Sequence, residues 1–393
     1  MAIDFQQISL RIREFGKSAR ERRKTIEERR EKARALLNQY AGELDFLRAK
    51  VDSAKAADPN LRCARPLNEP LDSHHPAPDS VDESTLIAAD GSQINPDRHA
   101  SLLYSLINIG LVVFKPGSNL APEVFSYADI KYGDELYTDT GNLLTEDLVA
   151  LGRDISERRK LLDLAAGYPG QVITFTDGPI ELWGAKGGSE ADFRRNREIH
   201  LSILSQMATK NILTAGYIDK PAADLVTRLL EITQVAENDM KDIRSKHSLR
   251  GVSDRWLFSP LKKGERSAIF VMQSSSRNYY TGDLEIHFFY LNVGDEKHPW
   301  VVRVEIPYWV AKDKNKVNLV HAALMRQCEI MGPKPYPYIL HRAHESAVVK
   351  LDEKQQVEQM LAKELLDQDD EVGEVSYKQS AKDLEGIDRT RHR

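Results

Sequence analysis

Two segments of the sequence place an apolar run directly before an Asp-Gly pair. Residues 86–89 run into Asp90-Gly91, and residues 172–176 run into Asp177-Gly178. A carboxylate at the end of a buried strand, followed by a glycine that leaves room for a ligand near the backbone, commonly holds a hard divalent cation. Asp-Gly is also an ordinary turn dipeptide, which is the simpler interpretation of either copy alone. Because both copies follow buried-type strands, we expect Asp90 and Asp177 to face a shared site if the strands lie in one sheet.

A third candidate lies near the C-terminus, in residues 335–347. Pro335 and Pro337 hold the chain extended, and the helical turn that follows carries Ala343, His344 and Ala347. The small residues let this turn pack closely. A histidine here could ligate a metal, exchange protons or contact a phosphate. Spacing alone favours a structural histidine.

Several common catalytic motifs are missing from the sequence. It contains no GxxxxGK[ST], GxGxxG, GxSxG or HExxH pattern, which argues against most P-loop, dinucleotide-binding, triad-hydrolase and zincin enzymes. Gly187-Gly188 before Ser189 could hold an anion, but Ser189 is more simply a helix N-cap. His74 and His75 lie in a Pro-rich segment without a third ligand, so we expect a solvated loop rather than a metal site.

The composition is that of a globular protein, with 393 residues, 41% hydrophobic and 29% charged. Cys63 and Cys328 can build neither a disulfide framework nor a zinc cluster, and the N-terminus has no signal pattern, so we expect a cytoplasmic protein. The longest apolar stretch, residues 102–114, is too short for a membrane span.

The charge is distributed unevenly along the chain. The net charge is −5, but residues 1–50 hold 13 basic and 8 acidic residues, and residues 351–393 hold 7 basic and 12 acidic. An acidic total does not exclude DNA when basic groups line the working channel.

The elements that must position these residues follow an α/β pattern. We expect a helical arm over residues 1–56, formed mostly by one long helix, then a Pro-rich linker over 57–84. Residues 85–350 alternate strands and helices, and 351–393 form a helix and a charged tail. The expected strands are 85–89, 102–114 (broken near Gly110), 123–128, 172–176, 212–217, 268–273, 286–292 and 300–306; the expected helices are 145–166, 189–210, 222–236, 315–330 and 352–367.

Taken together, these segments resemble the NurA nuclease family over about residues 84–350. The match consists of the first Asp-Gly-Ser, the second Asp-Gly and a late Tyr-Pro-Tyr…Ala-His, with further agreement at 216–221, 254–258, 264–268 and 303–307. No segment is specific alone; their order and spacing carry the match. The resemblance implies a ribonuclease-H-like core and manganese-dependent DNA cleavage, with magnesium as an alternative. It also implies 5′-to-3′ exonuclease activity, with endonuclease activity on single strands as a further option. A homodimer that works with a HerA-type hexameric translocase in DNA end resection or repair is implied as well.

The resemblance also implies the site residues. Asp90 and Asp177 would be the two metal-binding aspartates, and Tyr336 and His344 match the family's late tyrosine and histidine. His341 competes with His344, but only His344 has the Ala-His and Ser-Ala neighbours.

The family uses in addition a glutamate on the helix before the second aspartate. Glu157 fits the Arg-x-x-x-Glu pattern best, while Asp163 has the same spacing with a shorter carboxylate. In this assignment Glu157 completes the coordination of two cations, and His344 ligates a metal or contacts the scissile phosphate. Candidate phosphate contacts are Arg266, Arg303 and the run Arg194, Arg195 and Arg197, although a surface or structural charge is the simpler interpretation of each.

Two alternatives remain open. The chain could be a catalytically weak adaptor that docks on a hexameric partner in a repair or phage-defence complex. In either case, the basic helical arm could be a solvated helix, a docking or dimerising element, or a DNA contact. The chain could instead be a ribonuclease or a nicking enzyme, because no residue of the sequence identifies deoxyribose or ribose as the substrate sugar. The assignment to DNA comes from the resemblance alone.

Overall fold

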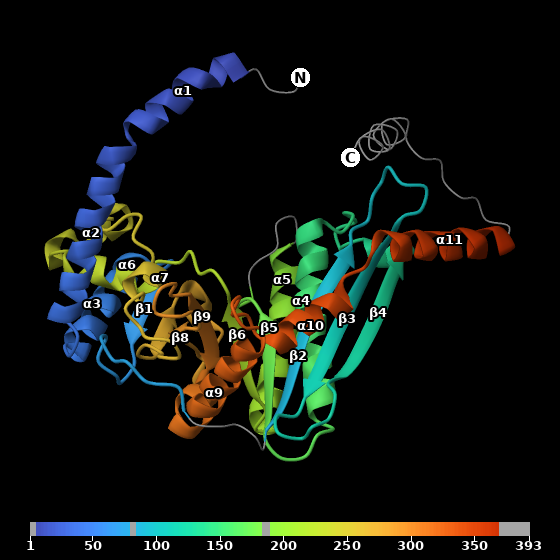
Figure 1. Ribbon diagram of the computed structural model, residues 1–393. Helices are drawn as coiled ribbons and strands as arrows, with labels where there is room; N and C mark the ends of the chain where they lie inside the picture. Colours follow the sequence, from blue (N-terminus) through green and yellow to red (C-terminus); the bar gives the residue numbers. More distant parts are fainter. Residues whose placement is uncertain (1–4, 79–83, 183–188, 369–393) are drawn as a thin grey trace. The chain divides into compact units, whose positions relative to one another are not determined.

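The computed structural model describes residues 5–78, 84–182 and 189–368 (Figure 1). The chain forms two compact units: residues 1–80 with 216–336 make unit 1, and residues 81–215 with 337–393 make unit 2. Gly187, Gly188 and the charged tail after residue 368 lie outside the described residues. Across the described ranges, no helix is long and apolar enough to span a membrane.

Unit 2 is built on a mixed sheet. Its strands are β2 (Thr85–Ile94), β3 (Tyr104–Phe114), β4 (Glu123–Tyr132) and β5 (Val172–Asp177), in the order β4-β3-β2-β5. The first three form an antiparallel meander, and β5 returns parallel to β2 after a crossover through α4 (Glu146–Ala165). This is the arrangement of the ribonuclease-H-like core that the sequence led us to expect.

Helices cover both faces of this sheet. Gly91 faces α4, since a Cβ there would meet Arg153 and Glu157, whereas a Cβ on Gly110 would meet the backbone of α10 (Tyr338–Ala347). Asp90 pairs with Gly110, and Gly91 pairs with Ile109. Because neighbouring residues of a strand project to opposite faces, Gly91 and Gly110 face opposite sides of the sheet, and so α4 and α10 cover opposite faces. The remaining helices of the unit are η1 (Gly133–Leu136), α5 (Glu190–Thr209), which packs on α4, and α11 (Leu351–Asp367).

Unit 1 has its own antiparallel strands, in the order β1-β7-β8-β9-β6. They are β1 (Cys63–Pro66), β7 (Phe270–Gln273), β8 (Ile286–Asn292), β9 (Val301–Pro307) and β6 (Leu213–Ile218), whose first half belongs to unit 2. A cluster of aromatic rings, Phe258, Phe270, Phe288 and Tyr290, lies in the core of unit 1. The helices are α6 (Leu225–Thr233), η2 (Glu237–Ser245), α7 (Asp254–Leu257), η3 (Ser275–Asn278), η4 (Gly282–Leu284), α8 (Tyr308–Ala311) and α9 (Lys314–Ile330).

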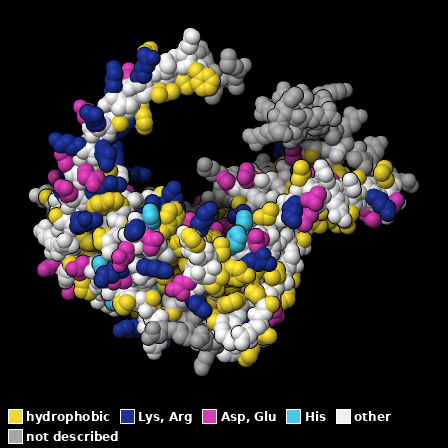
Figure 2. All heavy atoms as spheres, in the orientation of Figure 1, with side chains coloured by type: hydrophobic (Ala, Val, Ile, Leu, Met, Phe, Trp, Pro, Cys, Tyr) yellow, Lys and Arg dark blue, Asp and Glu magenta, His cyan; other side chains and the backbone are white. Residues whose placement is uncertain are grey.

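The N-terminal arm is broken where one long helix was predicted. It consists of α1 (Phe5–Lys17), α2 (Ala19–Gln39) and α3 (Leu44–Ala57). At the first break the Ser18 hydroxyl donates to the carbonyls of Glu14 and Phe15, a local bond that competes with helix continuation. α1 buries none of its residues. Figure 2 shows apolar side chains along one edge of α1 and basic side chains along the other.

Three further predictions were wrong in their details. The predicted linker contains β1, because Cys63–Pro66 pairs with β7 about 200 residues later. β2 does not end at Ala89 but continues to Ile94, since β3 supplies an antiparallel partner along its whole length. β3 is not broken at Gly110. The other expected strands and helices form within a few residues of their predicted bounds, and Cys63 and Cys328 are buried and free.

Of the paired histidines in the predicted linker, His74 is exposed, as expected, and His75 is partly buried. His75 Nε2 lies 3.2 Å from Glu69 and His74 Nδ1 lies 3.4 Å from Glu265. The backbone of His75 also exchanges hydrogen bonds with that of Arg266. The backbone of His75 thus holds the segment after β1 against Arg266.

Candidate active site

The two Asp-Gly aspartates occupy neighbouring positions on parallel strands. The pairing of β2 with β5 runs as far as Ala89 opposite Thr176, so Asp90 and Asp177 are the next positions along the two strands. Paired residues of parallel strands project from the same face, and the strands lie about 4.8 Å apart. Asp177 is exposed, and Gly178 after it has φ +95°, a conformation that favours glycine where β5 ends. The prediction that both strands lie in one sheet is confirmed.

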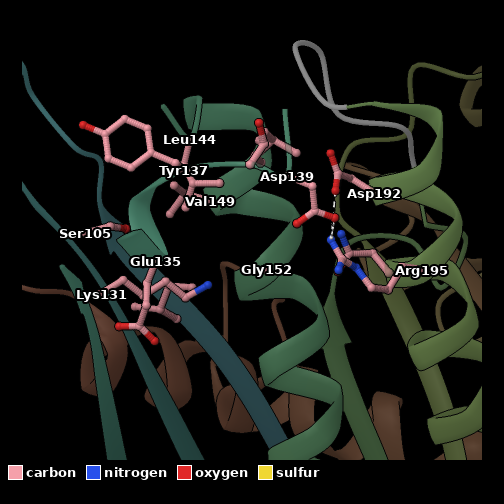
Figure 3. A pocket seen from close by; sticks show the side chains of 14 residues that line it. Ser105, Lys131, Glu135, Tyr137, Asp139, Leu144, Val149, Gly152, Asp192 and Arg195 are labelled. Carbon is pink, nitrogen blue, oxygen red and sulfur yellow. Dashed lines mark hydrogen bonds and ion pairs between the residues drawn. The ribbon is translucent and has the colours of Figure 1, made fainter. Parts of the chain in front are cut away.

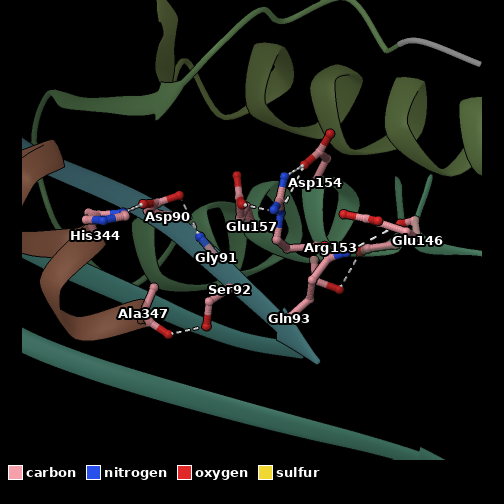
Figure 4. Close-up of polar contacts among 12 residues, drawn as sticks. Asp90, Gly91, Ser92, Gln93, Glu146, Arg153, Asp154, Glu157, His344 and Ala347 are labelled. Atoms are coloured by element: carbon pink, nitrogen blue, oxygen red, sulfur yellow. Dashed lines mark hydrogen bonds and ion pairs between the residues drawn. The ribbon is translucent and has the colours of Figure 1, made fainter. Parts of the chain in front are cut away.

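His344 reaches Asp90 across 254 residues of sequence. Its Nδ1 lies 2.6 Å from Asp90 Oδ2, and the same carboxylate accepts a hydrogen bond from the Gly91 amide at 2.8 Å (Figure 4). The His344 side chain is 62% exposed and that of Asp90 only 17%. The imidazole therefore has one nitrogen held by the carboxylate and the other nitrogen on an exposed side chain.

A glycine lets α10 come this close. Gly110 pairs with Asp90 across β2 and β3, and a Cβ on Gly110 would lie 2.5 Å from the carbonyl oxygen of Ala343 and 2.7 Å from the amide nitrogen of Ala347. α10 buries Ile339, Leu340, Ala343 and Ala347, so its small residues face the sheet as the sequence predicted. Gly110, where we expected β3 to break, is instead the position at which α10 comes close to the sheet.

Two polar side chains fix the C-terminal end of α10. Asn108 Nδ2 donates to the carbonyl of Ala347 at 2.8 Å, and the Ser92 hydroxyl donates to the same carbonyl. The Val349 amide in turn donates to Ser92 Oγ at 3.2 Å. Sequence reasoning missed both roles, although Ser92 was visible as the third residue of Asp-Gly-Ser.

Glu157 approaches the sheet from the α4 face. It is only 6% exposed, and a Cβ on Gly91 would lie 2.7 Å from its Oε1. Burial raises the pKa of the Glu157 carboxyl well above its usual value, and the charges of Asp154 and Asp90 add to this, while Arg153 at 3.5 Å opposes it. Asp163 is exposed and has no such surroundings. Of the two alternatives, the structure thus places Glu157 beside the Asp-Gly strand.

Arg158 holds the chain that follows Asp177. Its Nη1 donates to Thr176 Oγ1 at 3.1 Å and its Nη2 to the carbonyl of Pro179 at 2.6 Å. The side chain is buried on the α4 face, opposite to the face of Asp177. In the sequence, nothing distinguishes Arg158 from the basic residue after it.

Tyr336 and His341 have other surroundings. Tyr336 belongs to unit 1, where its ring packs edge-on against Tyr217 with centroids 5.5 Å apart. His341 lies 3.5 Å from Glu345 on the exposed side of α10. Only His344 of the two histidines touches Asp90.

Most of the proposed phosphate contacts have structural partners. Arg266 is 1% exposed and pairs with Glu69 at 3.0 Å, and Arg303 pairs with Glu305 at 3.0 Å. Arg195 pairs with acidic neighbours, and Arg197 lies over a phenylalanine ring. The structural interpretation of Arg266 and Arg303 is confirmed. The N-cap prediction for Ser189 is also confirmed by its capping box.

The donors around Asp90 have the chemistry of a hard-cation site without forming a complete cage. Asp90, Asp177 and Glu157 offer carboxylate oxygens and His344 offers an imidazole, a set that suits Mn²⁺ or Mg²⁺. Among the described residues, no group of three or more His, Cys, Asp or Glu side chains is arranged to hold a metal. Mg²⁺-type sites commonly use one or two carboxylates with water and substrate phosphate, and Asp90 and Asp177 are the pair that could serve in this way.

A family model described as the NurA domain matches residues 84–349. No curated protein matches the sequence. Among solved structures, endonuclease V of Ciona intestinalis in complex with DNA is similar over 79% of this chain and 96% of its own, at 11% identity and a TM-score of 0.28. The catalytic domain of human endonuclease V matches over 71% and 84%, at 10% identity and a TM-score of 0.29. The Argonaute of Marinitoga piezophila with guide RNA and target DNA matches over 70% and 31%, at 12% identity and a TM-score of 0.28. This chain spans about a third of that Argonaute.

Proposed function

Because the chain belongs to the NurA family of nucleases, we propose that it is a divalent-metal-dependent deoxyribonuclease. The activity we propose is 5′-to-3′ exonuclease cleavage of DNA, with endonuclease cleavage of single strands as a second mode. The observation that supports it best is the contact of 2.6 Å between His344 and Asp90, at the strand position beside Asp177. It joins the late histidine of the family pattern to the first Asp-Gly.

The ion we propose is Mn²⁺, with Mg²⁺ as the alternative. Asp90 and Asp177 would hold it, with Glu157 and His344 as further ligands. Bound cations would activate a water molecule and stabilise the leaving oxygen of a phosphodiester. The buried Glu157 supports this assignment, because a cation near its carboxylate would offset the repulsion from Asp90 and Asp154.

The protein's own groups would handle orientation and protons. With Asp90 ionised, His344 donates its Nδ1 hydrogen to Oδ2, and the neutral ring keeps a lone pair on Nε2. That nitrogen could accept a proton from an attacking water or, when protonated, bind a phosphate oxygen. Tyr336 is carried over from the family pattern as a further catalytic residue, and Tyr336→Phe tests it.

The proposed partner is a HerA-type hexameric translocase, with this chain acting as a homodimer in DNA end processing or repair. α1 supports a docking role, because Phe5, Ile12 and Phe15 are each more than half exposed on a helix that buries none of its residues. The same observation favours the second candidate function, a catalytically weak adaptor. The two differ in whether the Asp90 site cleaves DNA.

The deciding experiment is cleavage of 5′- and 3′-end-labelled duplex and single-stranded DNA in manganese, magnesium or EDTA. Metal-dependent cleavage that Asp90→Asn and Asp177→Asn both abolish supports the nuclease, and the label pattern gives the polarity. Glu157→Gln should lower the rate, whereas Asp163→Asn, an exposed carboxylate on the same helix, is the matched control. No cleavage in either metal, with and without a translocase, favours the adaptor. An RNA strand of the same sequence tests the choice of sugar.

A further inference from the structure

Unit 2 contains a cavity outside the Asp90 site. It has a volume of about 210 Å³ and lies among β3, β4, η1, the loop after η1, and the first turns of α4 and α5 (Figure 3). Ser105, Lys131, Glu135, Tyr137, Gly152 and Arg195 are among its lining residues. At about 30 Å³ per water, the volume corresponds to about seven water molecules, which is room for one nucleobase without its sugar.

The wall formed by the loop after η1 is ordered by its own backbone. Thr138 N donates to the carbonyl of Asn142 at 2.8 Å, and Leu144 N donates to that of Leu136 at 2.8 Å. On the other side, Arg195 is held by Asp139 at 3.1 Å and by Asp192 at 2.9 Å. The cavity is thus largely preformed, as binding sites for small planar groups usually are.

A helical glycine leaves the cavity open. Gly152 lies inside α4, where glycine is destabilising by about 1 kcal/mol relative to alanine. A Cβ there would meet only Ile107 Cδ1, at an ordinary contact distance of 3.7 Å, so packing does not require the glycine. A larger side chain at Gly152 would project into the cavity. The cavity therefore explains why glycine, which destabilises a helix, stands at position 152 of α4.

The lining suits a neutral planar group with hydrogen-bonding edges. Ser105 is 2% exposed, and its hydroxyl and the Lys131 ammonium opposite it on β4 make no hydrogen bond or ion pair within the described ranges. Acidic residues outnumber basic ones by three to two, namely Glu135, Asp139 and Asp192 against Lys131 and Arg195, which disfavours a phosphate. The Tyr137 ring can stack on a base, and carboxylates accept hydrogen bonds from exocyclic amines.

The cavity shares α4, and the face of the sheet that α4 covers, with Glu157. Gly152 precedes Glu157 by five residues on α4, which is about 7.5 Å along the helix axis, or about two steps of a stacked DNA strand. We propose that this cavity binds one nucleobase of the substrate strand and so fixes the strand's position relative to Asp90. This inference rests on the proposed nuclease function, because it assigns a contact to the same substrate.

The test measures binding separately from cleavage. Short 5′-labelled single DNA strands, each with one abasic position, are titrated by fluorescence anisotropy in EDTA with the full chain, with Gly152→Leu and with the control Asp163→Asn. The wild-type protein should lose about 5- to 150-fold in affinity at one abasic position, the range expected for one stacked base. Gly152→Leu should bind the intact strand with the same loss, and its affinity should not fall further with the abasic strand. Asp163→Asn, an exposed carboxylate on the same helix and outside the cavity, should bind as the wild type does.

Each result decides the inference. Wild-type affinity in Gly152→Leu, or an abasic effect that persists in this variant, would overturn it. If Gly152→Leu fails to fold by circular dichroism, Tyr137→Ala with Tyr137→Phe as control replaces it, and only the alanine should lose affinity. Strands that bind with the expected pattern but are not cut in manganese would refute the nuclease proposal alone. Cleavage without any abasic dependence would refute the cavity alone, and a wild-type protein that binds no strand would refute both.

Discussion

Replacing Gly110 with alanine should impair cleavage although Gly110 contributes no side chain to the site. The added Cβ would lie 2.5 Å from the Ala343 carbonyl oxygen and 2.7 Å from the Ala347 amide nitrogen, and both atoms are backbone atoms of α10. Ordinary contact begins at 3.4 Å, so α10 must retreat by about 0.9 Å, the difference between 3.4 and 2.5 Å. The helix carries His344, so the retreat should lengthen the contact of 2.6 Å between His344 and Asp90.

The expected loss follows from this displacement. A misplacement of about 1 Å at a catalytic constellation can cost about 100-fold in rate. The overpacked helix should also lower the free energy of unfolding by about 1–3 kcal/mol. The assay is the initial rate of cleavage of an end-labelled strand in manganese, with thermal melting and circular dichroism to show that the variant is folded.

Two comparisons make the test specific. Gly152→Ala adds the same methyl group in ordinary contact at 3.7 Å and should cleave at the wild-type rate. His344→Ala should cost less in the Gly110→Ala background than in the wild type, because the first change already weakens the same contact. A Gly110→Ala protein with wild-type rate and unchanged melting would refute the idea that the glycine positions α10.

Other parts of the molecule give three further predictions. In EDTA, Glu157→Gln should raise the melting temperature at neutral pH, because burial raises the pKa of this carboxyl well above 4.5 and the ionised form then destabilises the fold. This penalty develops as the pH rises above the unfolded value, so the gain should disappear near about pH 4, and a gain independent of pH contradicts the reasoning. Asp254→Ala should lower the free energy of unfolding in urea by about 3 kcal/mol or more, because the buried carboxylate accepts three hydrogen bonds, whereas Asp254→Asn should lose less. Removal of residues 1–17 should shift the melting temperature by less than about 1 °C, since α1 buries none of its residues, and a larger shift would show that α1 packs on the fold.

The elements that the sequence predicted well are those specified by local pattern. The strand at Ile286–Asn292 forms at its predicted bounds because its middle, Phe288–Leu291, reads as a short apolar run and all seven residues are buried. α4 and α5 begin where Thr145 and Ser189 accept hydrogen bonds from the first helical turn, a signal that lies within four residues of sequence. Such signals need no knowledge of distant residues.

The elements that were predicted wrongly depend on distant partners. Cys63–Pro66 becomes a strand only because β7 lies beside it, and no alternation within four residues announces that pairing. β2 runs beyond Asp90 because β3 pairs with Gly91–Ile94, where the Asp-Gly pair alone suggested an end. The candidate active site also depends on residues that are distant in sequence. The types of Asp90, Asp177 and His344 were visible in the sequence, but the contact between Asp90 and His344 arises from the docking of α10 on β2 and β3.

The two glycines of the central hairpin show how helices on both faces approach one point of the sheet. Gly91 and Gly110 lie at successive pairs of β2 and β3 and face opposite sides, so the sheet lacks a side chain on each face there. Their neighbours differ in kind. A Cβ on Gly91 would meet Arg153 and Glu157 side-chain atoms, which can turn aside, whereas one on Gly110 would meet only backbone. The α4 side of the site is therefore adjustable, while the α10 side is restricted by backbone atoms of α10. This asymmetry suits a site in which Asp90 and His344 are held in place and Glu157 can move toward a ligand.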